Sequence, residues 1–299
     1  MRHIMTLRRA MLAVVLGLAT MGPGRITAGS APIPTEAGQV ASRSAAEWLA
    51  QAQAARQAEP VDWVAVREAY EAAAALGSLP AMSQVGWIHE QGLGTPVDLV
   101  AAARWYAPVA KGGQDDFAIK LGWMYLQPEL GPDRAQSEAW FQTAIARDSA
   151  AARVALASVL VADAQGGRDP ARVTEAQALL ETALRQGHPL ASRFLARIHV
   201  EQIGGYASTP ASRLHYTRLA AEDGQGLMQA WLAQRYLDGD GVPQNLLEAA
   251  FWAALAAANH EPLGQQLHVS LQSQLSEAQR RQVMERSIAW TLQRTGAGT

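Results

Sequence analysis

Two stretches of this chain follow the same residue pattern. They read HEQGLGTPVDLVAAARWYAPVA from His89 and YLDGDGVPQNLLEAAFWAALAA from Tyr236, and both glycines, the proline and the tryptophan stand at equivalent places. A pattern that recurs along a chain indicates an architecture of stacked units, because each unit buries its apolar face only against its neighbours. This feature therefore constrains the fold more than composition does.

Each unit is predicted to be two amphipathic helices joined by a glycine turn. From Ala81, apolar and small residues share one helical face, Gly92 and Gly94 follow, and a second helical face runs through Trp105. The same frame recurs about every 36 residues, beginning at Ala45, Ala81, Phe117, Ala152, Ala191 and Met228. We expect an all-α, right-handed α-solenoid of about six helix-turn-helix repeats with a C-terminal helical cap.

Small and aromatic residues recur at fixed places because neighbouring helix pairs must approach closely. The close-approach positions are Gly86, Gly122, Ala196 and Ala233. The aromatic residues expected to fill the space between pairs are Trp105, Trp140, Tyr216 and Trp252, with Tyr236 on the shared face of its own first helix. The loop glycines, Gly92, Gly94, Gly239 and Gly241, are expected to turn the chain with positive φ, which glycine adopts without a Cβ penalty.

The pattern A-x-x-x-L-G-x-x-Y-x-x-G-x-G-V-P-x-D, followed by W-Y-x-x-A-A, resembles the Sel-one-like repeat family, a relative of the tetratricopeptide repeats. The resemblance covers about Ala45 to His260. His89 and His199 stand where the family usually has Tyr, and the units that begin at Ala152 and Ala191 lack the G-x-G loop. The resemblance implies an adaptor, since family members act in envelope signalling, exopolysaccharide assembly and host contact.

The first residues have the three-part form of a secretory signal peptide. Arg2, Arg8 and Arg9 precede an apolar run from Ala10 to Met21, and small residues follow, so cleavage after Ala28 is expected. The run is shorter than the ~20 residues of a spanning helix, although a retained anchor is the alternative. The expected organisation is 1–28 signal peptide, 29–41 flexible lead-in, 42–260 solenoid, 261–293 capping helices and 294–299 disordered tail.

The expected cap has a polar outer face, as the end of a solenoid requires. Ser276 to Gln279 reads SEAQ, which has the form of a capping box that opens a last helix. The apolar residues of this region are Leu263, Leu267, Leu271, Leu275, Val283, Met284, Ile288 and Leu292.

Composition and motifs exclude several classes of site. The chain contains no cysteine, which excludes a disulfide framework. Its net charge is −2, and removal of the signal peptide with its arginines makes the charge more negative, which disfavours nucleic-acid binding. The G-x-G stretches lack the third glycine of a dinucleotide fingerprint, and Val242 occupies a position where a calcium loop needs an oxygen ligand. His89 and His199 are interpreted as packed core residues. No cofactor, no metal and no catalytic residue is expected.

Tetratricopeptide repeats line their concave groove with the first helix of each pair, and the analogy selects candidate groove residues. They are Trp87, Trp123, Arg193, Arg197 and Gln234. Tryptophan and arginine are the usual anchors of a binding surface. The competing interpretation is that the two indoles pack against neighbouring helices or against the N-terminal segment.

The sequence thus favours a non-enzymatic protein interaction scaffold, periplasmic or secreted, in the bacterial cell envelope. We expect a protein or peptide partner and no nucleic acid, no metal and no membrane span after signal cleavage. One alternative is a β-lactam-binding or β-lactam-hydrolysing enzyme, since a branch of the resembled family is so described, but that branch relies on disulfides within its repeats. Another is a structural subunit of an exopolysaccharide or envelope assembly complex.

Overall fold

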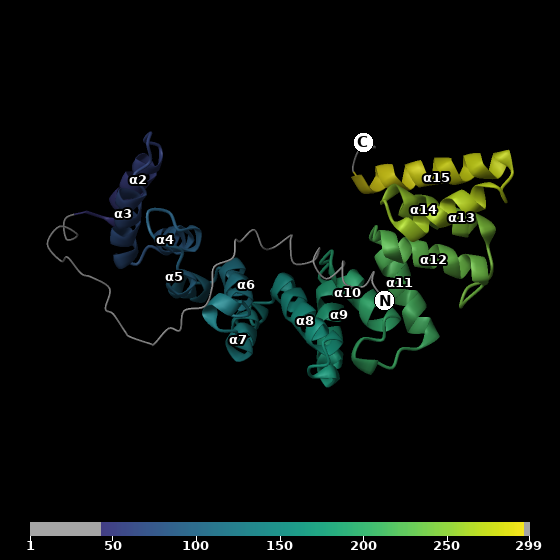
Figure 1. The fold of residues 1–299 in the computed structure, drawn as a ribbon, viewed down its shortest axis with the longest axis horizontal. Helices are drawn as coiled ribbons and strands as arrows, with labels where there is room; N and C mark the ends of the chain where they lie inside the picture. The colour runs from purple at the N-terminus through teal and green to yellow at the C-terminus, as the bar shows by residue number, and fades with distance from the viewer. Residues whose placement is uncertain (1–42, 296–299) are drawn as a thin grey trace. The chain divides into compact units, whose positions relative to one another are not determined.

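The computed structural model describes residues 43–295, and within them every regular element is helical. The predicted signal peptide, the lead-in and the final residues 296–299 lie outside the described range. Successive α-helices form pairs along the chain (Figure 1). The pairs are α2 (Ala45–Arg56) with α3 (Trp63–Ala75), α4 (Leu79–Gln91) with α5 (Leu99–Lys111), α6 (Asp115–Met124) with α7 (Arg134–Ile145), α8 (Ala150–Gln165) with α9 (Val173–Arg185), α10 (Ala191–Val200) with α11 (Pro210–Glu222), and α12 (Gly226–Asp238) with α13 (Leu246–Ala258).

Two further helices and three short 3-10 turns complete the described chain. The helices are α14 (Pro262–Gln272) and α15 (Glu277–Thr295), and the turns are η2 (Pro128–Leu130), η3 (Pro170–Arg172) and η4 (Ile203–Gly205). Each of the six expected frames begins at or inside the first helix of a pair. The all-α fold with six helix-turn-helix repeats and a helical cap is therefore confirmed, although α15 continues past Gln293, where the sequence placed the end of the cap.

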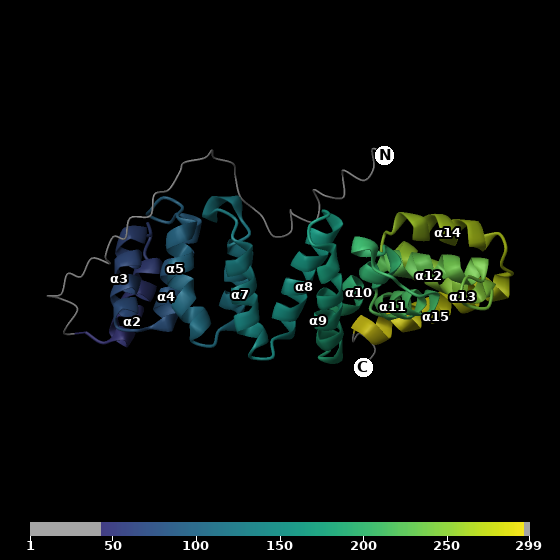
Figure 2. The ribbon, with the colours of Figure 1, turned by 90° about the horizontal axis from the view of Figure 1, so that it is seen from below.

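The pairs stack in chain order. Each helix from α3 to α13 packs against the helix before it and the helix after it, α14 packs on α12 and α13, and α15 packs on α13 (Figure 2). First helices also meet across pairs, because α8 contacts both α6 and α10, whereas no contact of similar extent joins α7 to α5 or α9. First helices therefore form the more closely spaced layer in this part of the solenoid.

Local sequence signals explain where the helices start and stop. Nine of the described helices begin at a residue whose side chain accepts a hydrogen bond from a backbone N–H of the first turn, which satisfies a donor that the helix itself leaves free. These residues are Ser44, Asp62, Ser78, Asp98, Asp133, Ser149, Thr209, Asn245 and Ser276. Gly92 and Gly239 end α4 and α12 in the left-handed region, at φ 68° and 72°, so the expected turn role of these glycines is confirmed.

The apolar core is a series of clusters, and neighbouring aromatic residues contribute to successive clusters. Trp105 packs against the cluster built on α2, α3 and α4, whereas Tyr106 belongs to the cluster of α5 and α6. On α7, Trp140 likewise packs against the cluster of α5 and α6, whereas Phe141 belongs to the next cluster, which includes residues of α8 and α9. The second helices α5 and α7 therefore each contribute to two successive clusters.

The close-approach glycines lie under the second of these aromatic residues. A Cβ atom at Gly86 would lie 2.5 Å from Cε1 of Tyr106, and one at Gly122 would lie 2.5 Å from Cε1 of Phe141. Both rings are almost fully buried. Sequence reasoning singled out the tryptophans and missed the residue after each of them, which is the one that contacts the glycine.

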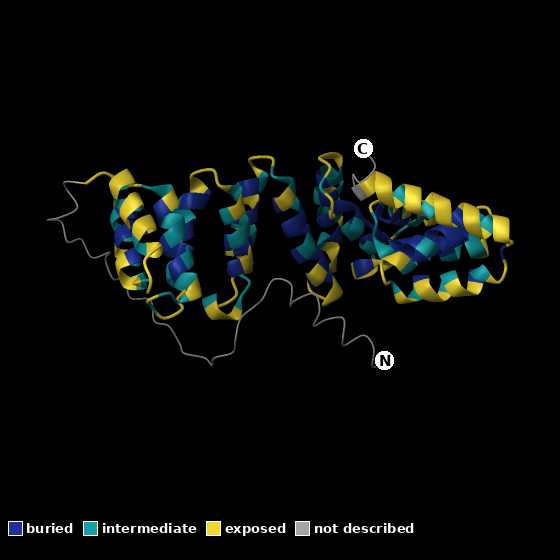
Figure 3. Ribbon diagram, turned by 90° about the horizontal axis from the view of Figure 1, so that it is seen from above, coloured by how far each residue is buried: buried dark blue, intermediate teal, exposed yellow. Residues whose placement is uncertain are grey.

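The C-terminal helix departs from expectation on its outer face. Ser276 and Gln279 form the expected capping box, with the Gln279 N–H donating to Ser276 Oγ and the Ser276 N–H donating to Gln279 Oε1. Val283 is buried, but Met284 and Ile288 are 56% and 52% exposed. Figure 3 shows much of α15 as exposed. The outer face of the cap therefore carries apolar side chains beside its polar ones, because one residue along a helix turns the side chain by about 100°, and Met284 cannot share the face of Val283.

Within residues 43–295, no helix combines the length and the apolar character that crossing a membrane requires.

Candidate functional site

The predicted groove residues all stand on first helices. Trp87 lies on α4, Trp123 on α6, Arg193 and Arg197 on α10, and Gln234 on α12. We call the face that carries these five residues the first-helix surface. Its members differ in how far each is already engaged by the rest of the chain.

Trp123 is the most accessible aromatic residue of the first-helix surface. Its side chain is 37% exposed, and its ring stands edge-on to Phe141 at a centroid distance of 5.4 Å and an interplanar angle of 74°. Because Phe141 is itself locked over Gly122, the indole is held by a rigid support. A large apolar side chain that is fixed yet open to solvent can bind a partner at a small cost in conformational entropy.

Trp87 is half-buried and belongs to a separate aromatic group. Its ring meets Trp63 at 5.9 Å and 63°, and the guanidinium of Arg56 lies 5.4 Å from its centroid. No ring contact joins Trp87 to Trp123 within the described residues. The two indoles are therefore two independent features of the surface, and the competing interpretation, packing against neighbouring helices, describes Trp87 better than Trp123.

Two of the three polar side chains on the first-helix surface already make hydrogen bonds within the chain. Arg197 Nε donates to Glu201 Oε1 at 3.2 Å, and Gln234 Nε2 donates to both carboxylate oxygens of Asp238. Arg193 makes no hydrogen bond or ion pair in the described part of the chain. Arg193 is thus the polar member whose donors remain available to a ligand.

The first-helix surface is interrupted at α8. Val154, which stands at the same place in its unit as Arg193, is 5% exposed, and Val161 on the same helix is 1% exposed. The turns η3 and η4 pack against α8 and cover it. These turns occupy the two units in which the sequence lacks the G-x-G loop, and both irregular loops fold over α8, which is the first helix of the earlier unit.

His199 lies at the centre of a buried polar cluster on α10. Its Nδ1 is 3.1 Å from Ser208 Oγ and 3.2 Å from Ser212 Oγ, and its ring stacks on Tyr216 at 4.4 Å. Burial lowers the pKa of His199, and the charge of Glu181 opposes this shift only in part. The interpretation of His199 as a packed core residue is confirmed.

Tyr216 and His89 have shifted pKa values for the same main reason. Burial, followed by the hydrogen bond that its hydroxyl donates to Glu181, raises the pKa of Tyr216 to about 12. Burial lowers the pKa of His89, whose Nε2 lies 4.0 Å from Glu71 Oε1. Both residues serve packing between helices.

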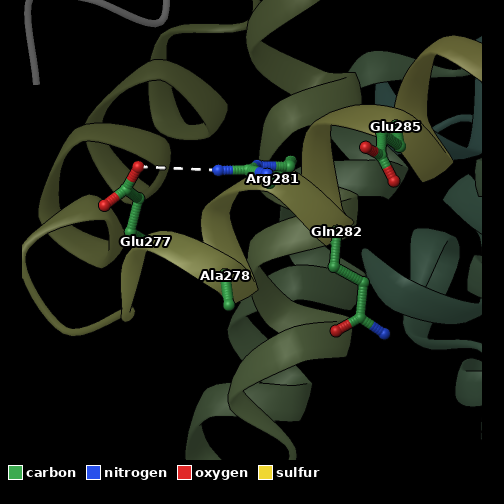
Figure 4. A pocket seen from close by; sticks show the side chains of 5 residues that line it. All are labelled: Glu277, Ala278, Arg281, Gln282 and Glu285. Carbon is green, nitrogen blue, oxygen red and sulfur yellow. Dashed lines mark ion pairs between the residues drawn. The ribbon is translucent and has the colours of Figure 1, made fainter.

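The described residues contain no cluster of three or more histidine, aspartate and glutamate side chains arranged to hold a metal ion. The depression shown in Figure 4 lies along one side of α15, between Glu277 and Glu285. Its ion pair, Glu277 with Arg281 at 3.6 Å, is highly exposed. A single helix face with solvated charges offers neither a desolvated pocket nor converging polar groups, so this depression lacks the features of a ligand site.

Known families and structures match the helix pairs described above. The Sel1 repeat family matches residues 79–113, 116–149 and 226–260, which cover α4 with α5, α6 with α7, and α12 with α13. Three segments of this chain thus match the Sel1 repeat. The Sel1 pattern is strong where the glycine turn and the aromatic pair occur together, and the pairs outside the match lack one or both.

Solved structures show the same solenoid fold. A protective antigen present in uropathogenic Escherichia coli strains, which displays an SLR fold, aligns with a TM-score of 0.58 at 21% identity over 82% of this chain and 53% of that chain. A Sel1 repeat protein from Oxalobacter formigenes aligns with a TM-score of 0.53 at 20% identity over 72% of this chain and 85% of that chain. The chain thus spans about half the length of the first relative. No curated protein matches the sequence.

Two residues near Trp87 escaped the sequence analysis. Arg56 is in the last turn of α2, and Trp63 opens α3, so neither stands at a position that the repeat frame assigns to the groove. The only sequence signal that could have found them is the WVAVREAY stretch, whose leading tryptophan has no structural role in the repeat pattern.

Proposed function

We propose that this protein is an exported interaction scaffold of the bacterial cell envelope, which binds a protein or peptide partner on the first-helix surface. Sel1 repeats generally mediate protein–protein interactions, and their fold is typically a non-catalytic scaffold. The single observation that best supports a binding role here is Trp123, an indole that stands on a rigid aromatic support and remains open to solvent.

Export rests on the first residues of the sequence. The arginines, the apolar run and the small residues that follow have the order of a signal peptide. The test fuses residues 1–42 to alkaline phosphatase that lacks its own signal. Phosphatase activity in the periplasm supports export, and a matched fusion with Val14 and Val15 changed to Arg should abolish it. Equal activity from the two fusions would contradict the signal-peptide interpretation.

Binding at the first-helix surface is tested by comparing two exposed positions. Envelope extract is passed over the immobilised full chain, the Trp123→Ala variant and the Val64→Ala variant, and bound proteins are identified by mass spectrometry. Val64 is 43% exposed but lies on α3, a second helix, so its loss should leave capture unchanged. A partner that is lost with Trp123→Ala and kept with Val64→Ala supports the surface. Equal capture by both variants would rule out this surface.

A further inference from the structure

Arg56, Trp63 and Trp87 form a compact group at the N-terminal end of the solenoid, which we call the Arg56 cluster. The guanidinium carbon of Arg56 lies 5.9 Å from the Trp63 ring centroid and 5.4 Å from that of Trp87, within the range of a cation–π contact. Arg56 Nη1 also donates to Gln84 Oε1 on α4 at 3.2 Å. The three contacts fix the guanidinium against two helices other than its own.

Arg56 differs from most arginines of the chain in lacking an acidic partner. Ten arginines in the described residues pair with a carboxylate, among them Arg172 with Glu138 and Arg286 with Glu248, but Arg56 is in none of these ion pairs. The nearby Asp62 carboxylate is engaged instead by the backbone N–H groups of Val64 and Ala65. A full positive charge is therefore held in place without a counter-charge.

The two indoles add further donors. Neither Trp63 nor Trp87 donates a side-chain hydrogen bond in the described residues, and neither indole nitrogen is among the buried atoms that lack a partner. Both N–H groups are thus within reach of solvent. A guanidinium presents N–H donors in a planar fork that matches the two oxygens of a carboxylate, and its fixed position here lowers the entropy lost on binding.

We propose that the Arg56 cluster binds a carboxylate side chain of the peptide that lies on the first-helix surface. Trp87 belongs to both the Arg56 cluster and the first-helix surface. The acidic residue of the peptide would therefore lie next to the apolar residues with which the peptide contacts the indoles. This proposal rests on the proposed function, since it names the chemical class of the partner: an acidic peptide with apolar residues beside its Asp or Glu.

The test uses a displayed library of random twelve-residue peptides, selected in parallel on the full chain and on three variants. Arg56→Met keeps an aliphatic stem over the indoles and removes the fork and the charge. Arg56→Lys keeps the charge and loses the fork. Arg104→Met is the matched control, because Arg104 is exposed on α5 and makes no ion pair or hydrogen bond in the described residues. Circular dichroism and thermal melts check that every variant folds.

The proposal expects peptides selected by the wild-type chain to be enriched in Asp and Glu. One selected peptide should bind Arg56→Met at least about tenfold more weakly and Arg104→Met within about twofold, and Arg56→Lys should fall between them. Changing its acidic residue to the amide should weaken wild-type binding as much as Arg56→Met does, and the two changes together should cost no more than either alone.

The failures of the two proposals are distinguishable. Selected peptides that lack acidic enrichment, or that bind Arg56→Met as tightly as wild type, overturn the carboxylate site and leave peptide binding on the first-helix surface standing. A library from which no peptide is selected contradicts the proposed peptide-binding function itself, and with it the site.

Discussion

Single atoms decide how closely two Sel1 helices approach. In the two adjacent units that match the Sel1 repeat, a glycine on the first helix accepts the edge of an aromatic ring from the second, and the space that a Cβ would need is already taken. Protein interiors are packed as densely as organic crystals, so such a contact cannot be relieved without moving a ring or a helix. The glycine here is required by packing, and its φ is ordinary.

We expect Gly122→Ala to lower the free energy of unfolding by about 1–3 kcal/mol, because overpacking forces the Phe141 ring out of its position. The measurement is urea denaturation followed by circular dichroism. The control is Gly166→Ala, where the nearest atom to a Cβ would be 3.5 Å away and stability should hardly change. The double variant Gly122→Ala, Phe141→Leu should recover part of the loss, and a double variant with simply additive losses would contradict the contact.

His199 gives a second expectation at the residue scale, in the dependence of stability on pH. Because burial lowers the folded-state pKa from the ordinary value of 6.5, the unfolded chain takes up a proton at a higher pH than the folded chain. The contribution of His199 to the free energy of unfolding is therefore fully present above pH 6.5. It decreases as the pH falls below 6.5, and the decrease stops below the folded-state pKa.

Urea denaturation between about pH 7.5 and about pH 5 measures this loss. The pKa values of His89 and His188 are also lowered by burial, so His199→Asn should reduce the pH dependence without abolishing it. The exposed Val64→Ala change, which removes no titratable group, should leave the dependence intact. An unchanged pH dependence in His199→Asn would show that His199 is not among its sources.

At the scale of elements, arginines from later helices close the C-terminal ends of earlier ones. Arg147, which follows α7, donates to the carbonyl oxygens of Ala110 and Lys111 at the end of α5. Arg294 of α15 donates in the same way to the carbonyls of Glu222 and Asp223 at the end of α11. Helix ends carry unsatisfied carbonyls and partial negative charge, so a guanidinium there stabilises the end and ties two units together.

We expect Arg147→Met to cost about 1–2 kcal/mol of stability, since two carbonyls lose a charged donor. Hydrogen exchange should show faster exchange in the last turn of α5 and the first turn of α6. Arg185→Met is the control, because within residues 43–295 the Arg185 side chain donates a hydrogen bond only to the hydroxyl of Thr182 on its own helix. Unchanged exchange at the α5 end would mean that water satisfies these carbonyls equally well.

At the scale of the whole molecule, the described residues 44–295 form a stack whose contacts run mainly between helices that are neighbours in the chain. Stability of such an array is approximately a sum of unit terms and nearest-neighbour interfaces, so a change at one end should be felt most by the adjoining pair. The helices α14 and α15 extend the stack, with α14 on α12 and α13 and α15 on α13. Leu271, Leu275 and Val283 bury themselves in the cluster of the last repeat.

Ending the chain after Glu261 should therefore expose the apolar surface of α12 and α13 and promote aggregation. Hydrogen exchange should show lost protection in α12 and α13, while α4 to α7 remain protected. A chain that ends at Thr295 and lacks only 296–299 is the control. Uniform loss of protection along the whole chain would indicate a single cooperative unit instead of a stack of neighbours.

The repeat frame, the helix pairs and the turn glycines could be predicted from the sequence because each depends on local chemistry. Helical periodicity, capping side chains and the freedom of glycine at positive φ act within a few residues. The frame also placed Trp87 and Trp123 on first helices, since those positions recur with every unit.

Contacts between distant residues were decided only by the tertiary structure. Which side chain lies over Gly122, how η3 and η4 cover α8, and how Arg56 comes to lie beside Trp87 depend on the angles and distances between helices. The same holds for Met284 on the outer face of α15. The repeat period predicts which residues share a helical face, but only the packing between helices determines which residues that face contacts.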